Sequence, residues 1–264
     1  MNNINNVAGQ WIRLRRILNP HTGRSLIIPL DHAITSGPVK GLTHPSKIVT
    51  MAAQSGADAV MLRPGLIHAV AETDSKNLGI ILALTGRFDR GIDHVLLNSV
   101  EHALRYGADA ICTEFKFGSD GDLENAKMAS EITERAHQYN LPVLMTIYAI
   151  PGQVQRLGEG AYAHACRIGE ELGADMVKIY LPNDEEVIQS CLDAVSVPLI
   201  MAGGSKSNTD EFYDHVETAI QLGVAGAAIG RNIWEHDNSS EIASKLAAII
   251  HERNPKLEQE QLYI

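Results

Sequence analysis

Four segments of the chain share one pattern, in which a helix-like stretch ends at a glycine and a run of apolar residues follows. The segments are SGADAVML (55–62), YGADAICT (106–113), LGADMVKI (172–179) and LGVAGAAI (222–229). A glycine supplies the left-handed residue that ends a helix, and a continuous apolar run is typical of a strand buried on both faces of a parallel sheet. Each segment therefore predicts the end of a helix and the strand after it.

A second set of apolar runs supplies four more strands. The glycines of the four segments are 51, 66 and 50 residues apart, about twice the roughly 30 residues of one strand–helix–strand unit. The additional runs are SLIIPL before Asp31, GIILAL before Thr85, LPVLMTIY ending at Tyr148, and VPLIMA before Gly203. Eight strands result, and they alternate with helical segments such as residues 122–139 and 240–251.

Alternating strands and helices fit either an eight-fold barrel or an open, doubly wound sheet. A dinucleotide-binding sheet is expected to carry Gly-x-Gly-x-x-Gly after its first strand, whereas this strand leads into PLDHAITSGP. The pattern therefore predicts an α/β fold, a single (β/α)8 TIM barrel that spans residues 1–264. Residues 1–24 are an N-terminal extension, in which residues 11–18 form an amphipathic helix over the closed end. Residues 253–264 are a polar tail, either frayed or donated to a neighbouring subunit.

The composition excludes several classes of partner. The 264 residues carry a net charge of −10, which disfavours nucleic acid and anionic membranes as partners. No run approaches the roughly 20 apolar residues of a membrane span, and the start MNNINN lacks the apolar core of a secretory signal. The three cysteines, Cys112, Cys166 and Cys191, fit neither a disulfide framework nor a metal site. We therefore expect reduced thiols and a cytoplasmic location.

Lys178 lies inside a predicted strand, in the run DMVKIYLP (residues 175–182). Alternation along the strand places Met176, Lys178 and Tyr180 on one face, which in a closed barrel is the interior. A lysine attacks a ketone as the free amine and forms a Schiff base, and desolvation or nearby cations favour that form. The structural alternative is a lysine that pairs with a carboxylate such as Asp31 or extends to the rim.

Asp31 and Tyr148 end the first and fifth predicted strands, at the face where barrel enzymes gather their reacting groups. Making or breaking a carbon–carbon bond beside an iminium requires a hydroxyl proton to move, and a carboxylate or a phenol can move it. As alternatives, Asp31 caps the following loop and Tyr148 is an aromatic residue at the barrel rim. His32 is expected either to hydrogen-bond the backbone or to contact the substrate.

Two glycine-containing turns follow the seventh and eighth predicted strands, where barrel enzymes frequently bind a phosphate. Glycines let backbone amides approach an anion, and an arginine supplies positive charge. The alternative is that the glycines only turn the chain and that Arg231 pairs with Glu235 or Asp237. The predicted phosphate-binding residues are Gly203, Gly204, Ser205, Gly230 and Arg231, with Lys206 as a further substrate-binding candidate.

The sequence predicts no metal site and no cofactor. It contains 11 histidines, but neither a His-Glu-x-x-His motif nor a comparable paired spacing. Isolated histidines of this kind are expected to be surface residues. This prediction covers His44, His68, His94, His102, His137, His164, His215 and His236.

Taken together, these residues give a sequence that resembles the archaeal-type class I fructose-bisphosphate aldolases and, more closely, the 2-amino-3,7-dideoxy-D-threo-hept-6-ulosonate synthases. The resemblance covers nearly the whole chain, from IRLRRILNPHTGR through IPLDHAITSGPVKGL, ELGADMVKIY and MAGGSK to AIGRNIWEHDN. It implies that Lys178 forms the Schiff base, that Tyr148 donates or accepts a proton, and that Asp31 is the partnering acid or base. It also implies a phosphate cradle in the two glycine turns and a ring-shaped homo-oligomer, often a decamer.

Three segments depart from the pattern of these families, and they bear on which aldehyde the protein accepts. The chain has D-H-A at residues 31–33 where the families tend to have D-H-G, YAIPG where the synthases carry Tyr-Pro-Arg-Gly, and EFKFG after the fourth strand. Glu114 could hold an ammonium group, while Arg63, Lys116 or Arg156 could hold a carboxylate. Opposite charges of this kind suit aspartate semialdehyde better than glyceraldehyde 3-phosphate, whose second phosphate needs further positive charge.

The sequence therefore predicts a cofactor-free class I aldolase or transaldolase that joins dihydroxyacetone phosphate or another phosphorylated ketose to an aldehyde. Fructose-bisphosphate cleavage is the alternative activity. Two other classes remain open: a sugar-phosphate isomerase that uses the same phosphate loops without an imine, and a non-catalytic phosphosugar-binding protein. Trapping of an imine with borohydride distinguishes an aldolase from both.

Overall fold

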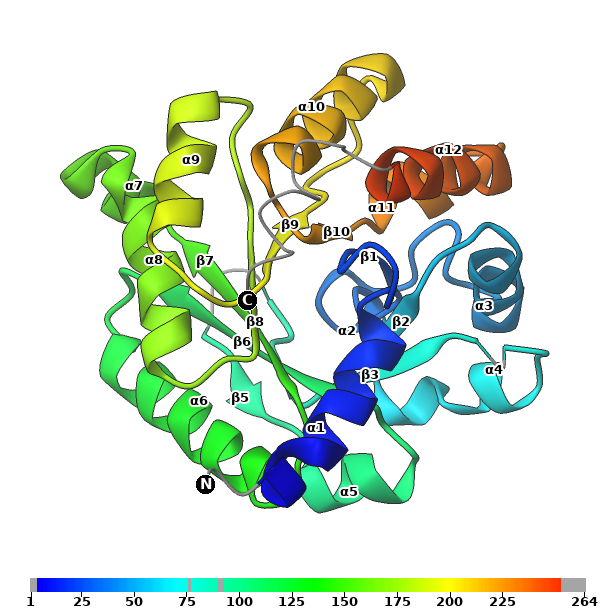
Figure 1. Ribbon diagram of the computed structural model, residues 1–264, viewed down its shortest axis with the longest axis horizontal. Helices are drawn as coiled ribbons and strands as arrows, with labels where there is room; N and C mark the ends of the chain where they lie inside the picture. The colour runs from blue at the N-terminus through cyan, green and yellow to red at the C-terminus, as the bar shows by residue number, and fades with distance from the viewer. Residues whose placement is uncertain (1–3, 76, 90–92, 253–264) are drawn as a thin grey trace.

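The computed structural model describes residues 4–75, 77–89 and 93–252, in which eight parallel strands close into a barrel (Figure 1). The order around the barrel is β1-β10-β9-β8-β7-β6-β3-β2, so strands that follow one another in the sequence are also neighbours in space. The predicted TIM barrel is confirmed. The strands are β1 (Ser25–Pro29), β2 (Ala59–Leu62), β3 (Gly79–Ala83), β6 (Ala110–Phe117), β7 (Val143–Ala149), β8 (Met176–Ile179), β9 (Leu199–Ala202) and β10 (Gly226–Ala228).

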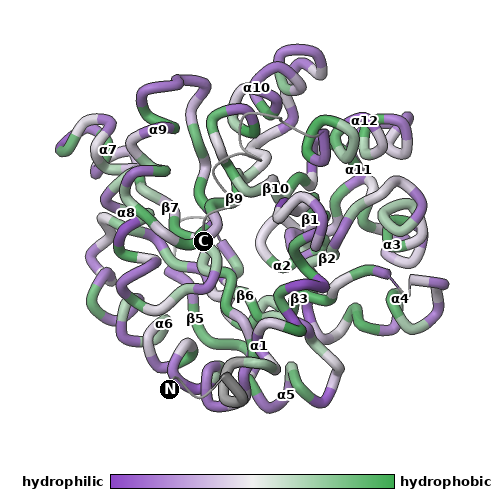
Figure 2. The backbone as a smooth tube through the Cα atoms, viewed as in Figure 1, coloured by the Kyte–Doolittle hydropathy of each residue, from purple (hydrophilic) through white to green (hydrophobic). Residues whose placement is uncertain are grey.

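Helices alternate with the strands and cover the outside of the barrel. The strands are the most hydrophobic segments, whereas the helices alternate between hydrophobic and hydrophilic positions (Figure 2). An apolar helix face can therefore pack on the barrel while the polar face contacts solvent. The outer helices are α3 (Pro45–Gln54), α4 (His68–Ala71), α5 (Val100–Arg105), α6 (Asp122–His137), α8 (Gly160–Glu171), α9 (Glu185–Asp193), α10 (Thr209–Leu222) and α12 (Ser239–His251).

Several short elements lie in the loops after the barrel strands, at the C-terminal end of the barrel. The antiparallel pair β4–β5 follows β3 and was not predicted, since each of its strands has only two residues. Loops at this end form the functional face of a TIM barrel. The short elements are α2 (Ala33–Ser36), the 3-10 helix η1 (Pro64–Leu66), β4 (Thr85–Gly86), β5 (Val95–Leu96), α7 (Pro151–Leu157) and α11 (Arg231–Trp234).

The repeated Gly-Ala-Asp sequences stabilise the opposite, closed end of the barrel. In each, the glycine has a positive φ between 75° and 89°, as expected for the residue that ends a helix. The aspartate two positions later accepts a backbone N–H bond from the start of a neighbouring strand. The bonds run from Leu26 to Asp58 (2.7 Å), from Ile80 to Asp109 (3.0 Å) and from Val143 to Asp175 (2.8 Å). The repeat therefore serves the fold and not the chemistry.

Helix α1 (Ile4–Ile17) crosses the closed end, as the sequence predicted for residues 11–18 (Figure 1). Arg16 lies 2.7 Å from Asp109 at the start of β6, and the carbonyl of Ile17 accepts a hydrogen bond from Ser25 at 2.7 Å. Ile17 is fully buried among the apolar side chains inside the barrel. The helix thus plugs one end and leaves the C-terminal end for ligands. The predicted tail, residues 253–264, lies outside the described residues.

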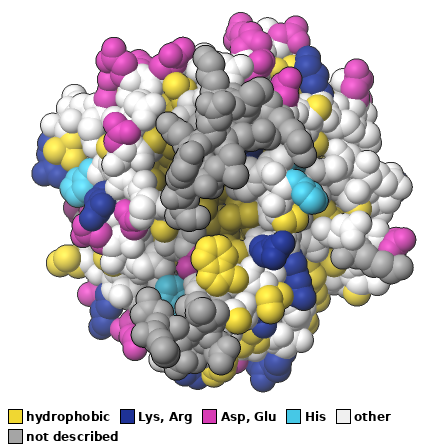
Figure 3. Space-filling view, viewed as in Figure 1, with side chains coloured by type: hydrophobic (Ala, Val, Ile, Leu, Met, Phe, Trp, Pro, Cys, Tyr) yellow, Lys and Arg dark blue, Asp and Glu magenta, His cyan; other side chains and the backbone are white. Residues whose placement is uncertain are grey.

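The surface and the cysteines agree with the composition. Acidic side chains gather along the edge formed by α9 and α10 (Figure 3). All three cysteines are buried and free. Within the ranges described above, no helix is long and apolar enough to cross a membrane.

Candidate active site

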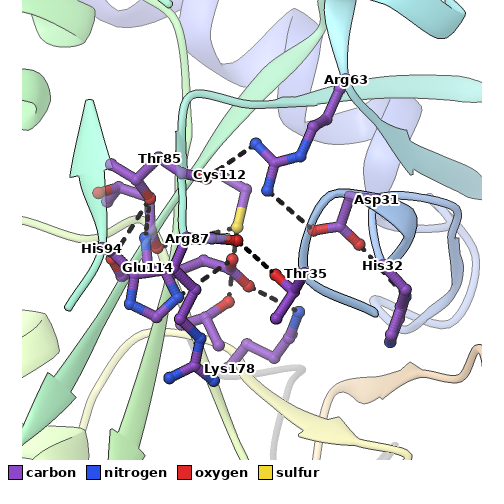
Figure 4. Close-up of polar contacts among 12 residues, drawn as sticks. Asp31, His32, Thr35, Arg63, Thr85, Arg87, His94, Cys112, Glu114 and Lys178 are labelled. Carbon is purple, nitrogen blue, oxygen red and sulfur yellow. Dashed lines mark hydrogen bonds and ion pairs between the residues drawn. The ribbon is translucent and has the colours of Figure 1, made fainter. Parts of the chain in front are cut away.

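Charged and polar side chains occupy the inside of the barrel at the C-terminal ends of six neighbouring strands. Along β8, Met176 belongs to the apolar interior, and Lys178 follows on the same face two positions later. On β6, Cys112 likewise belongs to the apolar interior, and Glu114 follows on the same face two positions later. The six residues placed in this way are Asp31, Arg63, Thr85, Glu114, Tyr148 and Lys178. Figure 4 shows most of them converging on one point.

Lys178 is buried, with 5% of its surface exposed, and its ion-pair partner is Glu114. The distance from Lys178 Nζ to Glu114 Oε1 is 3.9 Å. Strand register explains the pairing, because Glu114 and Lys178 both lie opposite Thr146 on the strand between them. Asp31, the partner considered from the sequence, lies instead 3.9 Å from Arg63 and 3.5 Å from His32.

Tyr148 lies next to the same carboxyl group. Its hydroxyl donates a hydrogen bond of 3.1 Å to Glu114 Oε1. Its ring stacks on His94 with centroids 5.8 Å apart and an interplanar angle of 6°, and the Arg87 guanidinium lies 5.5 Å from the ring centroid. Burial, followed by the charge of Glu114, raises the pKa of Tyr148 well above its usual value. The phenol therefore carries its proton at neutral pH and can donate it.

Glu114 lies at the centre of the site. Burial, followed by the nearby charge of Asp31, raises the pKa of Glu114, while Lys178 and Arg63 act in the opposite direction. The backbone of Glu114 is fixed independently of its side chain, because its N–H donates a 2.7 Å bond to Thr85 Oγ1. The carboxyl group that the sequence suggested for the acceptor thus contacts both Lys178 and Tyr148.

The prediction that His94 is a surface residue is wrong. His94 is only 5% exposed, because it lies between β4 and β5, a hairpin that the sequence did not reveal. Its Nε2 lies 3.7 Å from Glu114 Oε2. Burial, followed by the charges of Arg87 and Lys116, lowers the pKa of His94 to about 3, so its imidazole is neutral at physiological pH. Three further histidines of that prediction are partly buried: His102, His215 and His236.

Two cavities meet at Lys178. The larger, of about 680 Å³, extends from Lys178 over the loops after β9 and β10. The smaller, of about 240 Å³, is lined by the side chains that follow β1, β2 and β3. Four residues line both cavities: His32, Tyr148, Lys178 and Arg231. A ligand in one cavity would therefore meet a ligand in the other at the lysine.

All six residues of the two glycine turns line the larger cavity. Among the described residues, the backbone amides of Gly204, Ser205 and Gly230 have no acceptor. A Cβ atom at Gly230 would lie 3.1 Å from both His32 and Trp234, so the close packing favours glycine at this position. The residues of the two turns are Gly203, Gly204, Ser205, Lys206, Gly230 and Arg231.

Asn232 connects the two turns, a function that the sequence did not reveal. Its Nδ2 donates hydrogen bonds to the carbonyls of Gly203 (2.7 Å) and Ser205 (2.9 Å). Its Oδ1 accepts a bond of 2.9 Å from the N–H of Ser207. Lys206 adds a bond of 3.1 Å to the carbonyl of Glu235. The turns are thus held together before any ligand binds.

Two of the positively charged side chains that were predicted to hold the acceptor lie outside both cavities. Lys116 is buried 3.6 Å from Asp93, and Arg156 is exposed and bonds Gln153 at 2.8 Å. Neither lines either of the two cavities. Arg63 does line the smaller cavity, together with Arg87, which the sequence did not single out. In the part of the chain that the structure describes, no group of three His, Cys, Asp or Glu side chains could hold a metal ion.

Comparison with known proteins identifies the family. Residues 25–236 match the model of the DeoC/LacD family of aldolases. The chain belongs to this family. It is 35% identical over 249 residues to the 2-amino-3,7-dideoxy-D-threo-hept-6-ulosonate synthase 1 of Archaeoglobus fulgidus, covering 93% of this aldolase and 92% of that protein. Identity is 29% over 245 residues to the 2-amino-4,5-dihydroxy-6-oxo-7-(phosphonooxy)heptanoate synthase of Streptomyces griseus, with coverages of 91% and 89%.

Solved structures agree with this assignment. An archaeal fructose 1,6-bisphosphate aldolase superposes with a TM-score of 0.81 at 26% identity, covering 91% of this aldolase and 98% of that chain. Another such structure carries the carbinolamine intermediate of its substrate on the catalytic lysine. It has a TM-score of 0.80, 25% identity and coverages of 91% and 99%. The protein is therefore an enzyme of the Schiff-base-forming class of aldolases, and the resemblance noted in the sequence is confirmed.

Proposed function

We propose that Lys178 forms the Schiff base of this aldolase, with dihydroxyacetone phosphate or another phosphorylated ketose as its partner. The observation that carries the proposal is the place of Lys178, buried inside the barrel where two cavities meet. Its amine adds to the ketone carbonyl, water leaves, and the resulting iminium withdraws electrons from the neighbouring bond. The bond next to the iminium then breaks or forms through an enamine.

Tyr148 and Asp31 are proposed to move the protons of the carbon–carbon step. Tyr148 lines both cavities, so its phenol can reach a hydroxyl of either partner. Asp31 lines the smaller cavity and is 8% exposed, beside Arg63. A positioned acid or base of this kind typically contributes about 10²–10⁴-fold to the rate. Both assignments follow the family resemblance and the cavity geometry.

The two glycine turns are proposed to bind the substrate phosphate. The amides of Gly204, Ser205 and Gly230 supply donors, and Arg231 supplies a charge within the same cavity. A protein with a net charge of −10 needs such local compensation to hold an anion. The phosphate would lie at the far side of the larger cavity, which leaves the ketone carbonyl near Lys178.

Arg231→Ala tests this phosphate site. We expect KM for the phosphorylated ketose to rise about 10–100-fold, because a charge-assisted hydrogen bond contributes roughly 1.5–3 kcal/mol. KM for the same sugar without its phosphate should rise less than about 3-fold, because this sugar has no phosphate to accept the hydrogen bond. Steady-state kinetics with both sugars measures the difference, and Arg167→Ala, on the exposed face of α8, is the matched control. Equal losses for both sugars would show that Arg231 only holds the loop.

The smaller cavity is proposed to bind the aldehyde acceptor. Its walls carry three guanidinium groups, Arg63, Arg87 and Arg231, and two carboxyl groups, Asp31 and Glu114. Mixed charges suit a zwitterion with an ammonium and a carboxylate better than a second phosphate. Aspartate semialdehyde is therefore the proposed acceptor, and fructose-bisphosphate cleavage is the second candidate function because of the structural likeness to archaeal aldolases.

Competing rates decide between the two reactions. We expect kcat/KM for condensation with aspartate semialdehyde to exceed kcat/KM for cleavage of fructose 1,6-bisphosphate, because the cavity charges complement both ends of the semialdehyde. A coupled assay with each substrate at several concentrations gives both values. Faster cleavage of the bisphosphate would assign the protein to the second function.

The remaining features of the proposal come from the family resemblance. We propose that residues 1–264 act as one barrel domain, with residues 1–24 as its extension. We also propose a cytoplasmic homo-oligomer, with a ring of ten subunits as the form that the family resemblance implies. Light scattering measures the mass of the assembly in solution, and the mass of one subunit would contradict this part of the proposal.

A further inference from the structure

The larger cavity has an outer part that the proposed chemistry does not use. The inner part, between the glycine turns and Lys178, is the proposed place of the ketose phosphate. The whole cavity, of about 680 Å³, lies in the range of roughly 300–1,000 Å³ that is typical of sites for drug-sized ligands, which are larger than a triose phosphate. The wall of the outer part comes from the loop after β8 and the first two turns of α10, and it carries Tyr180, Asn183, Glu211, Phe212 and His215.

Tyr180 offers an aromatic surface next to the first glycine turn. The sequence predicted this residue inside the barrel, on the face of Lys178, but β8 ends at Ile179 and 49% of Tyr180 is exposed. Its ring lies against the turn, since a Cβ atom at Gly204 would be 3.1 Å from Tyr180 Cε2. Exposed aromatic side chains of this kind stack on nucleobases. A planar ring attached to a phosphate in the turns can therefore stack on Tyr180.

Two polar side chains of the outer part, Asn183 and Glu211, are exposed and have no hydrogen-bond partner among the described residues. A carboxylate accepts hydrogen bonds from the hydroxyls of a ribose. A side-chain amide both donates to and accepts from the edge of an adenine base. The two side chains therefore complement the two halves of a nucleoside.

The charge of the outer part disfavours a second phosphate. Of the five wall residues, only Glu211 is charged, because burial lowers the pKa of His215 and its imidazole is neutral at physiological pH. A carboxylate repels a phosphate, whereas it binds hydroxyl groups. The ligand that fits has its anionic group at the glycine turns, and the rest of it is neutral, hydroxylated and partly planar.

We propose that the larger cavity also binds a purine nucleoside 5′-monophosphate, with its phosphate in the glycine turns, its ribose beside Glu211 and its base on Tyr180 next to Asn183. The proposal rests on the phosphate site of the proposed function. The nucleotide phosphate occupies the turns that hold the ketose phosphate, so the two ligands exclude each other. The nucleotide is thus a competitive inhibitor that takes no part in the aldolase chemistry.

Titration calorimetry with adenosine 5′-monophosphate and with ribose 5-phosphate tests the proposal, because the two ligands differ only in the base. We expect the Kd of the nucleotide to be about 10–100-fold lower than the Kd of ribose 5-phosphate, the gain typical of one base stacked on an aromatic side chain. In steady-state kinetics, the nucleotide should raise the apparent KM for the phosphorylated ketose and leave kcat unchanged.

Two variants separate the contacts with the base and with the ribose. Tyr180→Leu should bring the Kd of the nucleotide to within about 3-fold of the Kd of ribose 5-phosphate, because the stacking surface is lost. Glu211→Gln should weaken both ligands about 3–10-fold, because both contain the ribose, and should leave the binding of inorganic phosphate unchanged. The matched controls are Tyr106→Leu and Glu217→Gln, two exposed residues that line neither cavity and should change no Kd.

The outcomes distinguish this proposal from the proposed function. Tighter binding of the nucleotide that Tyr180→Leu removes supports the nucleotide site. Equal Kd values for the nucleotide and ribose 5-phosphate, or a tight nucleotide complex that Tyr180→Leu leaves unchanged, would overturn the nucleotide site and leave the phosphate site intact. If neither ligand binds or competes with the ketose, the nucleotide site is again overturned, while the borohydride adduct on Lys178 reports separately on the Schiff-base function.

Discussion

Replacing Lys178 by methionine should abolish turnover and imine trapping while the barrel still folds. Methionine fills the buried space of the lysine stem but offers no amine, and removal of a covalent nucleophile costs as much as about 10⁶-fold in rate. The measurement is the mass of tryptic peptides after borohydride reduction in the presence of dihydroxyacetone phosphate. The reduced ligand should add to the peptide that contains Lys178 and to no other.

A second buried lysine gives a matched control for this experiment. Lys116 is 8% exposed on β6, but it lies next to Asp93 and lines neither cavity. Lys116→Met should therefore leave the adduct on Lys178. An adduct on Lys116, or on any lysine other than Lys178, would refute the proposed mechanism, and so would the absence of any adduct.

Tyr148→Phe should give the second largest loss, about 10²–10⁴-fold in kcat, the range typical of general acid–base groups. The phenol moves a proton only while the bond changes, so KM should stay within about 3-fold and imine trapping should persist. Steady-state kinetics and borohydride trapping measure the two effects separately. The ring itself should keep its place, because its contacts with His94 and Arg87 involve the ring face.

The control for Tyr148 is Tyr139→Phe, which removes an exposed hydroxyl just after the end of α6. Near-normal turnover in Tyr148→Phe would show that Tyr148 is only an aromatic residue at the barrel rim and moves no proton. Loss of trapping as well as turnover would instead indicate that the hydroxyl is also needed for the imine to form.

Much of the site could be predicted because successive side chains of a strand point to opposite faces of the sheet. Once β8 is recognised, Lys178 must lie on the same face of the strand as Met176, because residues two positions apart share a face. In a closed barrel, this face is the apolar interior. The glycine turns after β9 and β10 were found from their composition and position, and they do line one cavity with Lys178. These inferences need only local patterns and the general architecture of a βα barrel.

His94, Arg87 and Lys116 show where such reasoning stops. His94 is isolated in the sequence, and it is buried directly before β5, a two-residue strand that pairs with β4. Lys116 lies two positions after Glu114 on the same face of β6, yet it pairs with Asp93 and lines neither cavity. Short hairpins and ion pairs of this kind leave no periodic pattern in the chain.

The sequence by itself determined the eight strands, the closed-end helix, the inward direction of Lys178 and the location of the glycine turns, because these depend on residues close together in the chain. Only the tertiary structure decided that Glu114 shares one oxygen between Lys178 and Tyr148. Glu114 and Lys178 are 64 positions apart, and they meet because β7 pairs with both of their strands in a register that sets them at one level. That register is a property of the closed sheet as a whole, and no single segment contains it.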